Sequence, residues 1–216
     1  MKIEALLFDL GKVIINFNFD LVMERFAERS SLSTAELRNV IWDGDWIRRY
    51  ETGEISSREY HAYLCKAAGL QMDLDEFHAS WSAMFLPDLI IPEELLAILK
   101  ERYPLILVSN TNESHAAYIA ANYGVFRHFD HKIFSHEVGA MKPDRRMYEA
   151  AIAAAGKPPE ALFFTDDREE NVDAARRFGI RAHRFTALPA LLDAFQQHGV
   201  EIGEFLAADY ADRKAR

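Results

Sequence analysis

The chain has 216 residues, of which 50% are hydrophobic and 27% charged, so it is long enough to bury a sizeable core in one or two domains. Its formal net charge of −9 argues against nucleic acid as the main partner, because phosphate backbones favour basic patches. The single cysteine, Cys65, excludes an intrachain disulfide and any multi-cysteine metal site.

No apolar stretch approaches the roughly 18 residues that a membrane span needs. The N-terminal segment does not resemble a signal peptide, because Glu4, Asp9 and Lys12 interrupt its apolar run. We therefore expect a cytoplasmic protein that binds neither membranes nor nucleic acid and is a monomer or a weak homodimer.

The first predicted element is a short, buried strand over residues 3–8, which ends at Asp9. Residues 17–86 then contain no convincing strand and several amphipathic helical patterns, at 21–29, 34–41 and 57–68. Ser33 or Thr34, with Glu36 or Leu37 three residues later, gives only a partial capping signal for the second of these helices. We predict a helical cap over 17–86, inserted into a core formed by 1–16 and 87–216, with Pro87 and Pro92 marking the return to that core.

After the insert, apolar runs and helical patterns alternate. The predicted strands cover 105–108, 131–134, 161–164 and 181–185. The predicted helices cover 93–102, 113–123, 145–155 and 169–178, and the last should end at Gly179, a residue suited to a left-handed C-cap. This alternation predicts an α/β fold with a doubly wound, Rossmann-like parallel sheet.

Polar residues follow three of the predicted strands, namely Asp9, the pair Ser109 and Asn110, and the pair Asp166 and Asp167. Ligands of an open parallel sheet bind beyond the carboxyl ends of its strands, so we expect these residues to converge. Each residue alone has a simpler explanation as a helix cap or turn residue. The adjacent aspartates are the most informative pair, because their charges repel and a divalent cation would relieve that repulsion.

The order of four motifs resembles the haloacid dehalogenase superfamily, most of whose members are phosphatases. The resemblance covers residues 5–179, and residues 17–86 stand in the place of that family's type 1 cap. The four motifs are Phe8-Asp9-Leu10-Gly11-Lys12-Val13, Val108-Ser109-Asn110, Lys142-Pro143, and Asp166-Asp167 with Asn171-Val172.

The resemblance implies that Asp9 is the nucleophile and becomes an aspartyl phosphate. It implies Mg²⁺ as the cofactor, held by Asp9, Asp167 and the backbone carbonyl of Gly11. Asp166 would be either a further ligand or a residue behind the ligands.

The resemblance also assigns residues to the substrate, a small phosphorylated metabolite. Ser109 and backbone N–H groups around Asn110 would hydrogen-bond the phosphoryl oxygens. Lys142 would neutralise both the phosphate and Asp9.

One position departs from the family pattern. Most phosphatases of the superfamily carry a second aspartate two residues after the nucleophile, where this chain has Gly11. Gly11 keeps the carbonyl but has no carboxyl group for acid–base catalysis, which is typically worth about 10²–10⁴-fold. Gly11→Asp is therefore expected to raise activity most on poor leaving groups. Lys12, where the family usually has glycine, is a second departure.

Three functions remain open. The first is a Mg²⁺-dependent phosphatase for a small phosphomonoester with a good leaving group, such as an anomeric sugar phosphate; here the motifs resemble the alpha-D-glucose-1-phosphate phosphatase branch. The second is a metal-independent haloacid dehalogenase, which the paired aspartates disfavour. The third is a catalytically weak binding or regulatory protein.

Substrate choice is expected to reside in the cap. Trp42 and Trp46, four residues apart on a predicted helix, would share one face, suited either to a sugar ring or to packing of the cap. Arg48 or Arg49 would reach the substrate or lie on a solvated face.

Overall fold

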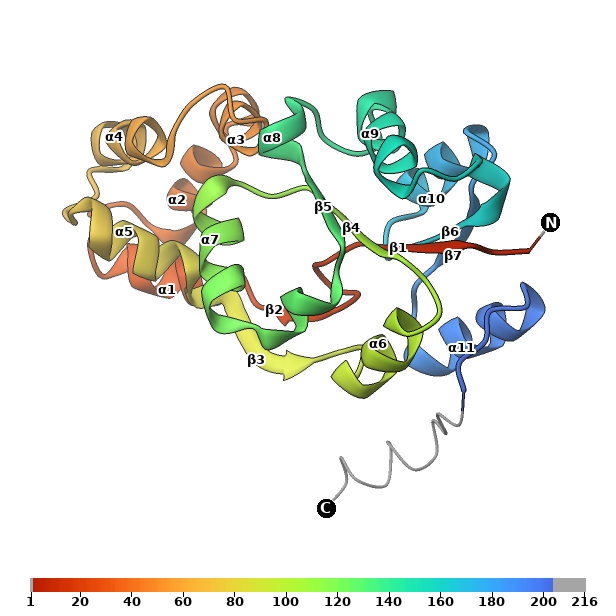
Figure 1. The fold of residues 1–216 in the computed structure, drawn as a ribbon. Coiled ribbons are helices and arrows are strands. Elements are labelled where there is room, and N and C mark those ends of the chain that lie inside the picture. The colour runs from red at the N-terminus through yellow and green to blue at the C-terminus, as the bar shows by residue number, and fades with distance from the viewer. Residues whose placement is uncertain (1, 204–216) are drawn as a thin grey trace, which may run out of the picture.

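The computed structural model describes residues 2–203, which form a five-stranded parallel sheet with helices on both faces and a separate group of helices at one end (Figure 1). The sheet order is β5-β4-β1-β6-β7. The strands are β1 (Ala5–Phe8), β4 (Leu105–Ser109), β5 (His131–Phe134), β6 (Leu162–Asp166) and β7 (Arg181–Arg184). The predicted α/β core is confirmed, and residues 204–216 of its predicted extent lie outside the described residues.

The central strand β1 shows why helices cover both faces of the sheet. Leu6 and Phe8 belong to one hydrophobic core and Ala5 and Leu7 to the other, because successive side chains of a strand point to opposite faces. The first core includes α6 (Glu93–Lys100), α7 (Glu113–Asn122) and α11 (Leu188–Gln197). The second includes α9 (Arg145–Ala155) and α10 (Glu169–Arg177), and Figure 1 shows these two helices opposite α6 and α11. A strand buried on both faces reads as a continuous apolar run, which is why β1, β4 and β6 were recognisable in the sequence.

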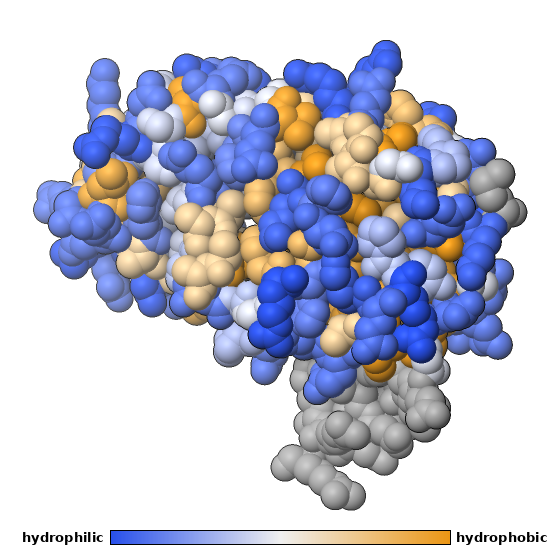
Figure 2. All heavy atoms as spheres, in the orientation of Figure 1, coloured by the Kyte–Doolittle hydropathy of each residue, from blue (hydrophilic) through white to orange (hydrophobic). Residues whose placement is uncertain are grey.

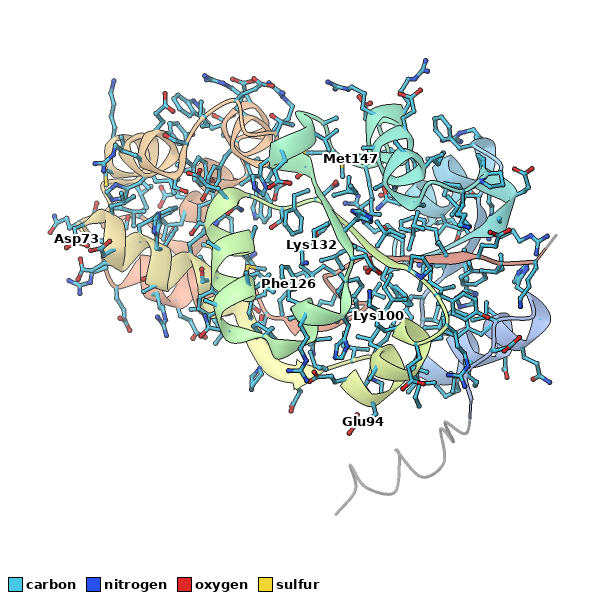
Figure 3. The ribbon with its side chains drawn as sticks, in the orientation of Figure 1. Asp73, Glu94, Lys100, Phe126, Lys132 and Met147 are labelled. Carbon is cyan, nitrogen blue, oxygen red and sulfur yellow. The ribbon has the colours of Figure 1, made fainter. Side chains whose placement is uncertain are left out.

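The side-chain view illustrates how the two faces are filled (Figure 3). Met147 of α9 is fully buried in the second core. On the other face, Phe126 lies in η2 (Gly124–His128), and the Lys132 ammonium lies 5.6 Å from the centre of its ring. Gly179 follows α10 with a φ of 82°, the left-handed conformation expected of it.

Of the six α-helices between β1 and β4, all but α6 pack around a hydrophobic core of their own, which includes Phe26, Tyr60, Phe77 and Trp81. They are α1 (Asp20–Ala27), α2 (Thr34–Ile41), α3 (Gly44–Glu51), α4 (Ser57–Ala68) and α5 (Leu74–Trp81), and we call them the helical unit. The partial capping signal at Ser33 is a complete capping box in the structure, and α4 and α5 begin with capping boxes as well.

Two short strands at the ends of this helical unit were not predicted. β2 (Ile15–Phe17) and β3 (Phe85–Leu89) pair antiparallel, with the 3-10 turn η1 (Ser82–Met84) before β3. Pro87 lies inside β3, where a two-stranded ribbon leaves one edge without partners and so tolerates the missing N–H. The boundaries at 16/17 and 86/87 fall inside or beside these strands, and the division into cap and core stays a prediction.

We call the five-stranded sheet, with the helices and loops that cover it, the sheet unit; the helical unit contacts it through the end of α3 and the start of α4. The Ser135 hydroxyl, at the start of α8 (Ser135–Val138), donates to the Glu51 carbonyl at 2.6 Å, and the Ser57 N–H donates to Glu113 Oε1 at 2.6 Å. Gly53 has a φ of 70°, and a Cβ there would lie 2.1 Å from the His136 carbonyl oxygen. Only glycine permits this approach, so Gly53 is required for the close packing of this turn against His136.

The visible surface is mostly hydrophilic in Figure 2, with apolar residues gathered over α7, where Ala117, Ala120 and Ala121 are exposed. Within residues 2–203, every helix is too short or too polar to cross a bilayer. The last short element is η3 (Pro159–Ala161), which leads into β6.

Candidate active site

A cavity of about 310 Å³ lies between the helical unit and the carboxyl ends of the strands. The sheet side contributes Asp9, Ser109, Lys142 and Asp167, and the helical unit contributes Trp42 and Glu51. The structure therefore brings together polar residues that are far apart in the sequence.

The strand register explains this convergence. Phe8, the last residue of β1, pairs with Leu107 in β4 and with Thr165 in β6. The chain leaves β1 for β4 on one side and later reaches β6 on the other, so the sheet has its topological switch point at β1. Asp9 extends the ladder by one step, since its N–H donates to the Thr165 carbonyl at 2.8 Å.

Lys142 is the positive centre of the site. Its Nζ lies 2.8 Å from Asp9 Oδ1 and 2.6 Å from Asp166 Oδ2, and it also donates to the Val108 carbonyl at 2.8 Å. The side chain is only 1% exposed. Burial acts to lower the pKa of Lys142, but the two carboxylates outweigh it and raise that pKa, so the lysine is a permanent cation.

Asp9 is buried, and its two oxygens differ. Oδ1 accepts hydrogen bonds from the Leu10 N–H at 2.7 Å and from Lys142, whereas Oδ2 has no protein partner among residues 2–203. Burial raises the pKa of Asp9, the Asp166 carboxylate adds to the rise, and Lys142 opposes it. Oδ2 is the oxygen available to react.

The two adjacent aspartates have different surroundings. Asp166 is fully buried, and its oxygens accept from Lys142, from the Arg168 N–H at 2.9 Å and from Asn171 Nδ2 at 3.0 and 3.1 Å. Asp167 is half-buried and lines the cavity, and its pKa is raised by burial and then by Asp166. Asp166 is thus occupied by protein donors, and Asp167 is the carboxylate turned to the cavity.

The side chain of Asn110 binds the backbone of Lys142, a contact that was not predicted from the sequence. Its side chain donates to the Lys142 carbonyl at 3.0 Å and accepts from the Lys142 N–H at 2.7 Å. This pair of bonds fixes the backbone of the lysine, so the Asn110 amide positions Lys142. Ser109 is buried beside it, and within residues 2–203 its hydroxyl has only a long contact to the Asn110 carbonyl, at 3.4 Å.

The donor set fits a hard divalent cation such as Mg²⁺. Carboxylate oxygens of Asp9, Asp166 and Asp167 lie within 4.8 Å of one another, and oxygen ligands are those that Mg²⁺ prefers. Asn171 Oδ1 is buried without a hydrogen-bond partner in the described residues, and Asn171 lines the same cavity. An unpartnered buried oxygen beside clustered carboxylates indicates space for an ion and its bound water.

In the loop after Asp9, the Phe17 ring occupies the space where a side chain at Gly11 would lie. A Cβ at Gly11 would lie 2.9 Å from Cε1 of the Phe17 ring. Lys12 has a φ of 59°, a conformation that costs a residue with a side chain roughly 1–2 kcal/mol. The Lys12 ammonium offsets this cost by donating to Asn16 Oδ1 at 2.8 Å and to the Phe17 carbonyl at 2.6 Å.

The prediction that Trp42 and Trp46 share a helix face is wrong. Trp42 ends α2, and Asp43 begins a new helix by accepting from the Asp45 N–H at 3.4 Å. Trp46 stacks on Tyr63 with ring centres 4.3 Å apart, inside the helical unit. Trp42 is 50% exposed and lines the cavity, so only one tryptophan of the pair faces the site.

The two arginines proposed as substrate contacts are engaged elsewhere. Arg48 pairs with Asp45 and Glu54, and the Arg49 guanidinium lies 5.0 Å from the centre of the Trp46 ring. Neither lines the cavity.

Two charged residues of the cavity were not assigned to the site from the sequence: Glu51, at the end of α3, and Arg168, in the loop after β6. Burial raises the pKa of Glu51 to about 7, although the nearby Arg168 lowers it. Glu51 belongs to the segment 48–51, in which only the two arginines were considered as substrate contacts, because the direction of its side chain depends on where α3 begins.

Comparisons with known proteins agree with this geometry. The family of haloacid dehalogenase-like hydrolases matches residues 3–179. The GMP/IMP nucleotidase YrfG of Escherichia coli is 36% identical over 89 residues, which are 41% of this chain and 39% of the nucleotidase. The D-ribitol-5-phosphate phosphatase of Bacteroides thetaiotaomicron is 22% identical over 184 residues, which are 82% of this chain and 89% of that enzyme.

Among solved structures, a HAD family enzyme from Bacteroides thetaiotaomicron in complex with magnesium and inorganic phosphate superposes with a TM-score of 0.73. It is 27% identical, and the match covers 86% of this chain and 96% of that enzyme. Because the family match covers residues 3–179, and Asp9, Lys142 and the paired aspartates lie together at the carboxyl ends of a parallel sheet, the chain belongs to the haloacid dehalogenase-like hydrolase family.

Proposed function

We propose that the protein is a Mg²⁺-dependent phosphatase that hydrolyses a small phosphomonoester through an aspartyl phosphate on Asp9. The observation that carries this proposal is Asp9, which lines the cavity together with Lys142 and Asp167 and whose Oδ2 has no hydrogen-bond partner within residues 2–203. The named activities of the nucleotidase and the ribitol-phosphate phosphatase, and the magnesium and phosphate of the solved relative, support it.

Each residue of the site has a part in this reaction. Asp9 Oδ2 attacks phosphorus while the bond from phosphorus to the leaving oxygen breaks. Lys142 holds Asp9 in place and neutralises the phosphoryl group, and the Ser109 hydroxyl donates to a phosphoryl oxygen. Asp9, Asp167 and the Gly11 carbonyl would hold Mg²⁺, which would supply the charge that lets an anionic nucleophile approach an anionic phosphate.

The cavity favours a small substrate with a sugar-like leaving group. A volume of about 310 Å³ lies at the small end of ligand sites, and the half-exposed Trp42 offers an aromatic face on the helical side. We assign a sugar phosphate as the substrate, with anomeric sugar phosphates first, because their leaving group needs least protonation.

Phosphate release from a panel of sugar phosphates, nucleoside monophosphates and p-nitrophenyl phosphate tests the proposal. We expect release with Mg²⁺ and a loss of at least about 10²-fold with chelator, because the cation contributes several kcal/mol of charge stabilisation. Halide release from 2-haloacids that is equal with and without chelator would instead establish the dehalogenase alternative. Absence of both would favour a binding protein.

Gly11→Asp alone is expected to gain no activity and to lower the free energy of unfolding by about 1–3 kcal/mol, because the new Cβ overlaps the Phe17 ring. The structure thus changes the expectation drawn from the sequence. Gly11→Asp combined with Phe17→Ala should fold better and raise turnover of glucose 6-phosphate about 10-fold. Phe17→Ala alone is the matched control. Gain of activity in the single Gly11 variant without loss of stability would contradict the steric argument.

A further inference from the structure

The proposed reaction needs a proton donor for the leaving oxygen, and Gly11 cannot supply one. We propose that Glu51, on the helical unit, is the general acid and base of this site. The inference rests on the proposed phosphatase function and adds to it the residue that moves the proton.

The other titratable residues of the cavity are unsuited to this task. Asp9 is the nucleophile and Asp167 a metal ligand in the proposed function, while Lys142 and Arg168 are permanent cations. The Lys12 ammonium is engaged by Asn16 and the Phe17 carbonyl.

His115 is also excluded as the acid. Its Nε2 lies 3.0 Å from the Trp81 carbonyl and its Nδ1 lies 3.2 Å from Asn112 Nδ2, so both ring nitrogens are occupied. Burial lowers the pKa of His115 to about 4, which leaves the ring neutral at pH 7. Within residues 2–203, Glu51 is the carboxyl group of the cavity that lies outside the Asp9, Asp166 and Asp167 cluster.

The backbone of Glu51 is anchored to the sheet unit. Ser135 Oγ lies 2.6 Å from its carbonyl oxygen and 2.8 Å from the Thr111 carbonyl oxygen, with one proton for the two acceptors, and it accepts from the Thr111 N–H at 2.8 Å. The close approach of Gly53 to His136 fixes the next turn of the same segment. These contacts fix the backbone position from which the Glu51 side chain lines the cavity, and general acid–base catalysis requires a positioned side chain.

The surroundings of Glu51 allow it to exchange a proton near neutral pH. Its carboxylate has no hydrogen-bond partner in the described part of the chain, and burial raises its pKa to about 7. Arg168 opposes that rise, and Tyr60 of α4 is close enough for Glu51 to raise the tyrosine's own pKa. The remaining charged groups around the cavity are Asp9, Lys12, Lys142 and Asp167.

The proton balance closes over two steps. As Asp9 Oδ2 bonds to phosphorus, the ester P–O bond breaks and the Glu51 carboxyl gives its proton to the departing oxygen, which leaves as an alcohol. The Glu51 carboxylate then takes a proton from water while the water oxygen bonds to phosphorus and the P–O bond to Asp9 breaks. Asp9, protonated Glu51 and free phosphate are the result.

Rapid mixing of Glu51→Gln with two probes, p-nitrophenyl phosphate and glucose 6-phosphate, tests the inference. Nitrophenolate needs no proton to leave, so the first-turnover burst of Glu51→Gln should keep the wild-type rate. The steady state that follows should be slow, because no base then takes the proton from the water that hydrolyses the aspartyl phosphate. Glucose 6-phosphate turnover should fall about 10²-fold or more. Glu54→Gln, three residues away and exposed, is the matched control and should behave as wild type.

Three other results overturn the inference. The first is an equal loss of both first-turnover rates in a folded Glu51→Gln, which would indicate a positional role. The second is an unchanged turnover of glucose 6-phosphate. The third is a change in KM alone, which would indicate a role in substrate binding. Should the variant fail to fold, the wild-type kcat for glucose 6-phosphate must fall as pH rises above about 7, since the acid must be protonated. A pH-independent kcat there would refute the role. Failure of the phosphatase function itself is distinct, because wild-type protein would then release no nitrophenolate.

Discussion

Asp9→Asn is expected to reduce phosphate release by at least about 10⁴-fold, because an amide cannot form the aspartyl phosphate. The fold should persist, since Asn keeps an oxygen at the place of Oδ1 for the Leu10 N–H and Lys142. Steady-state release with Mg²⁺ and the thermal unfolding midpoint are the two measurements.

Asp88→Asn, an exposed aspartate in β3, is the control for the change of charge and should retain full activity. Radiolabel from the phosphoryl group should remain on acid-quenched wild type and be absent from Asp9→Asn. A variant with more than a tenth of wild-type activity would remove Asp9 from the mechanism.

Lys142→Met is expected to lose about 10²–10³-fold in turnover and about 3–5 kcal/mol in the free energy of unfolding. The lysine is the buried cation that contacts both Asp9 and Asp166, so its removal leaves those carboxylates without a counter-charge. Mg²⁺ should raise the unfolding midpoint of the variant more than that of wild type, because the ion then supplies the missing positive charge.

Lys100→Met provides the comparison, since Lys100, which is labelled in Figure 3, forms a partly exposed ion pair with Asp130. Its loss should cost less than about 1 kcal/mol and leave turnover unchanged. Similar destabilisation in the two variants would show that Lys142 is an ordinary ion-pair partner and not the centre of the site.

The sheet could be predicted from the sequence because its central strands are buried on both faces. Runs such as 105–108 and 161–164 are apolar throughout, and each ends in a polar residue at the edge where the site forms. β2 and β3 could not be predicted, because neither carries a strand pattern. β2 has only three residues, with Asn16 in the middle, and β3 has five, with Pro87 among them. The start of α3 was placed wrongly, because Trp42 and Trp46 were predicted to share one helix and the turn at Asp43 separates them.

The site was predictable where residues follow strands and unpredictable where they come from the helical unit. Asp9, Ser109 and Asp166 converge through strand register, which follows from the topology. Glu51 enters the cavity through the docking of α3 against the sheet unit, a contact between segments more than eighty residues apart. The Phe17 ring leaves no room for a side chain at Gly11, since a Cβ there would lie 2.9 Å from Phe17 Cε1. No residue pattern in the sequence predicts this contact.

The Ser135 bond to Glu51 makes chemical competence depend on docking of the helical unit. Should α3 leave the sheet unit, the acid departs with it, while Asp9 and Lys142 stay on the strand ends. Bulk water would then reach Asp9, and no proton donor would lie near the leaving oxygen. A substrate with a poor leaving group would therefore form the aspartyl phosphate only while the helical unit is docked. The protein would discriminate among phosphomonoesters by whether they fit under the helices, a selection made before any bond is broken.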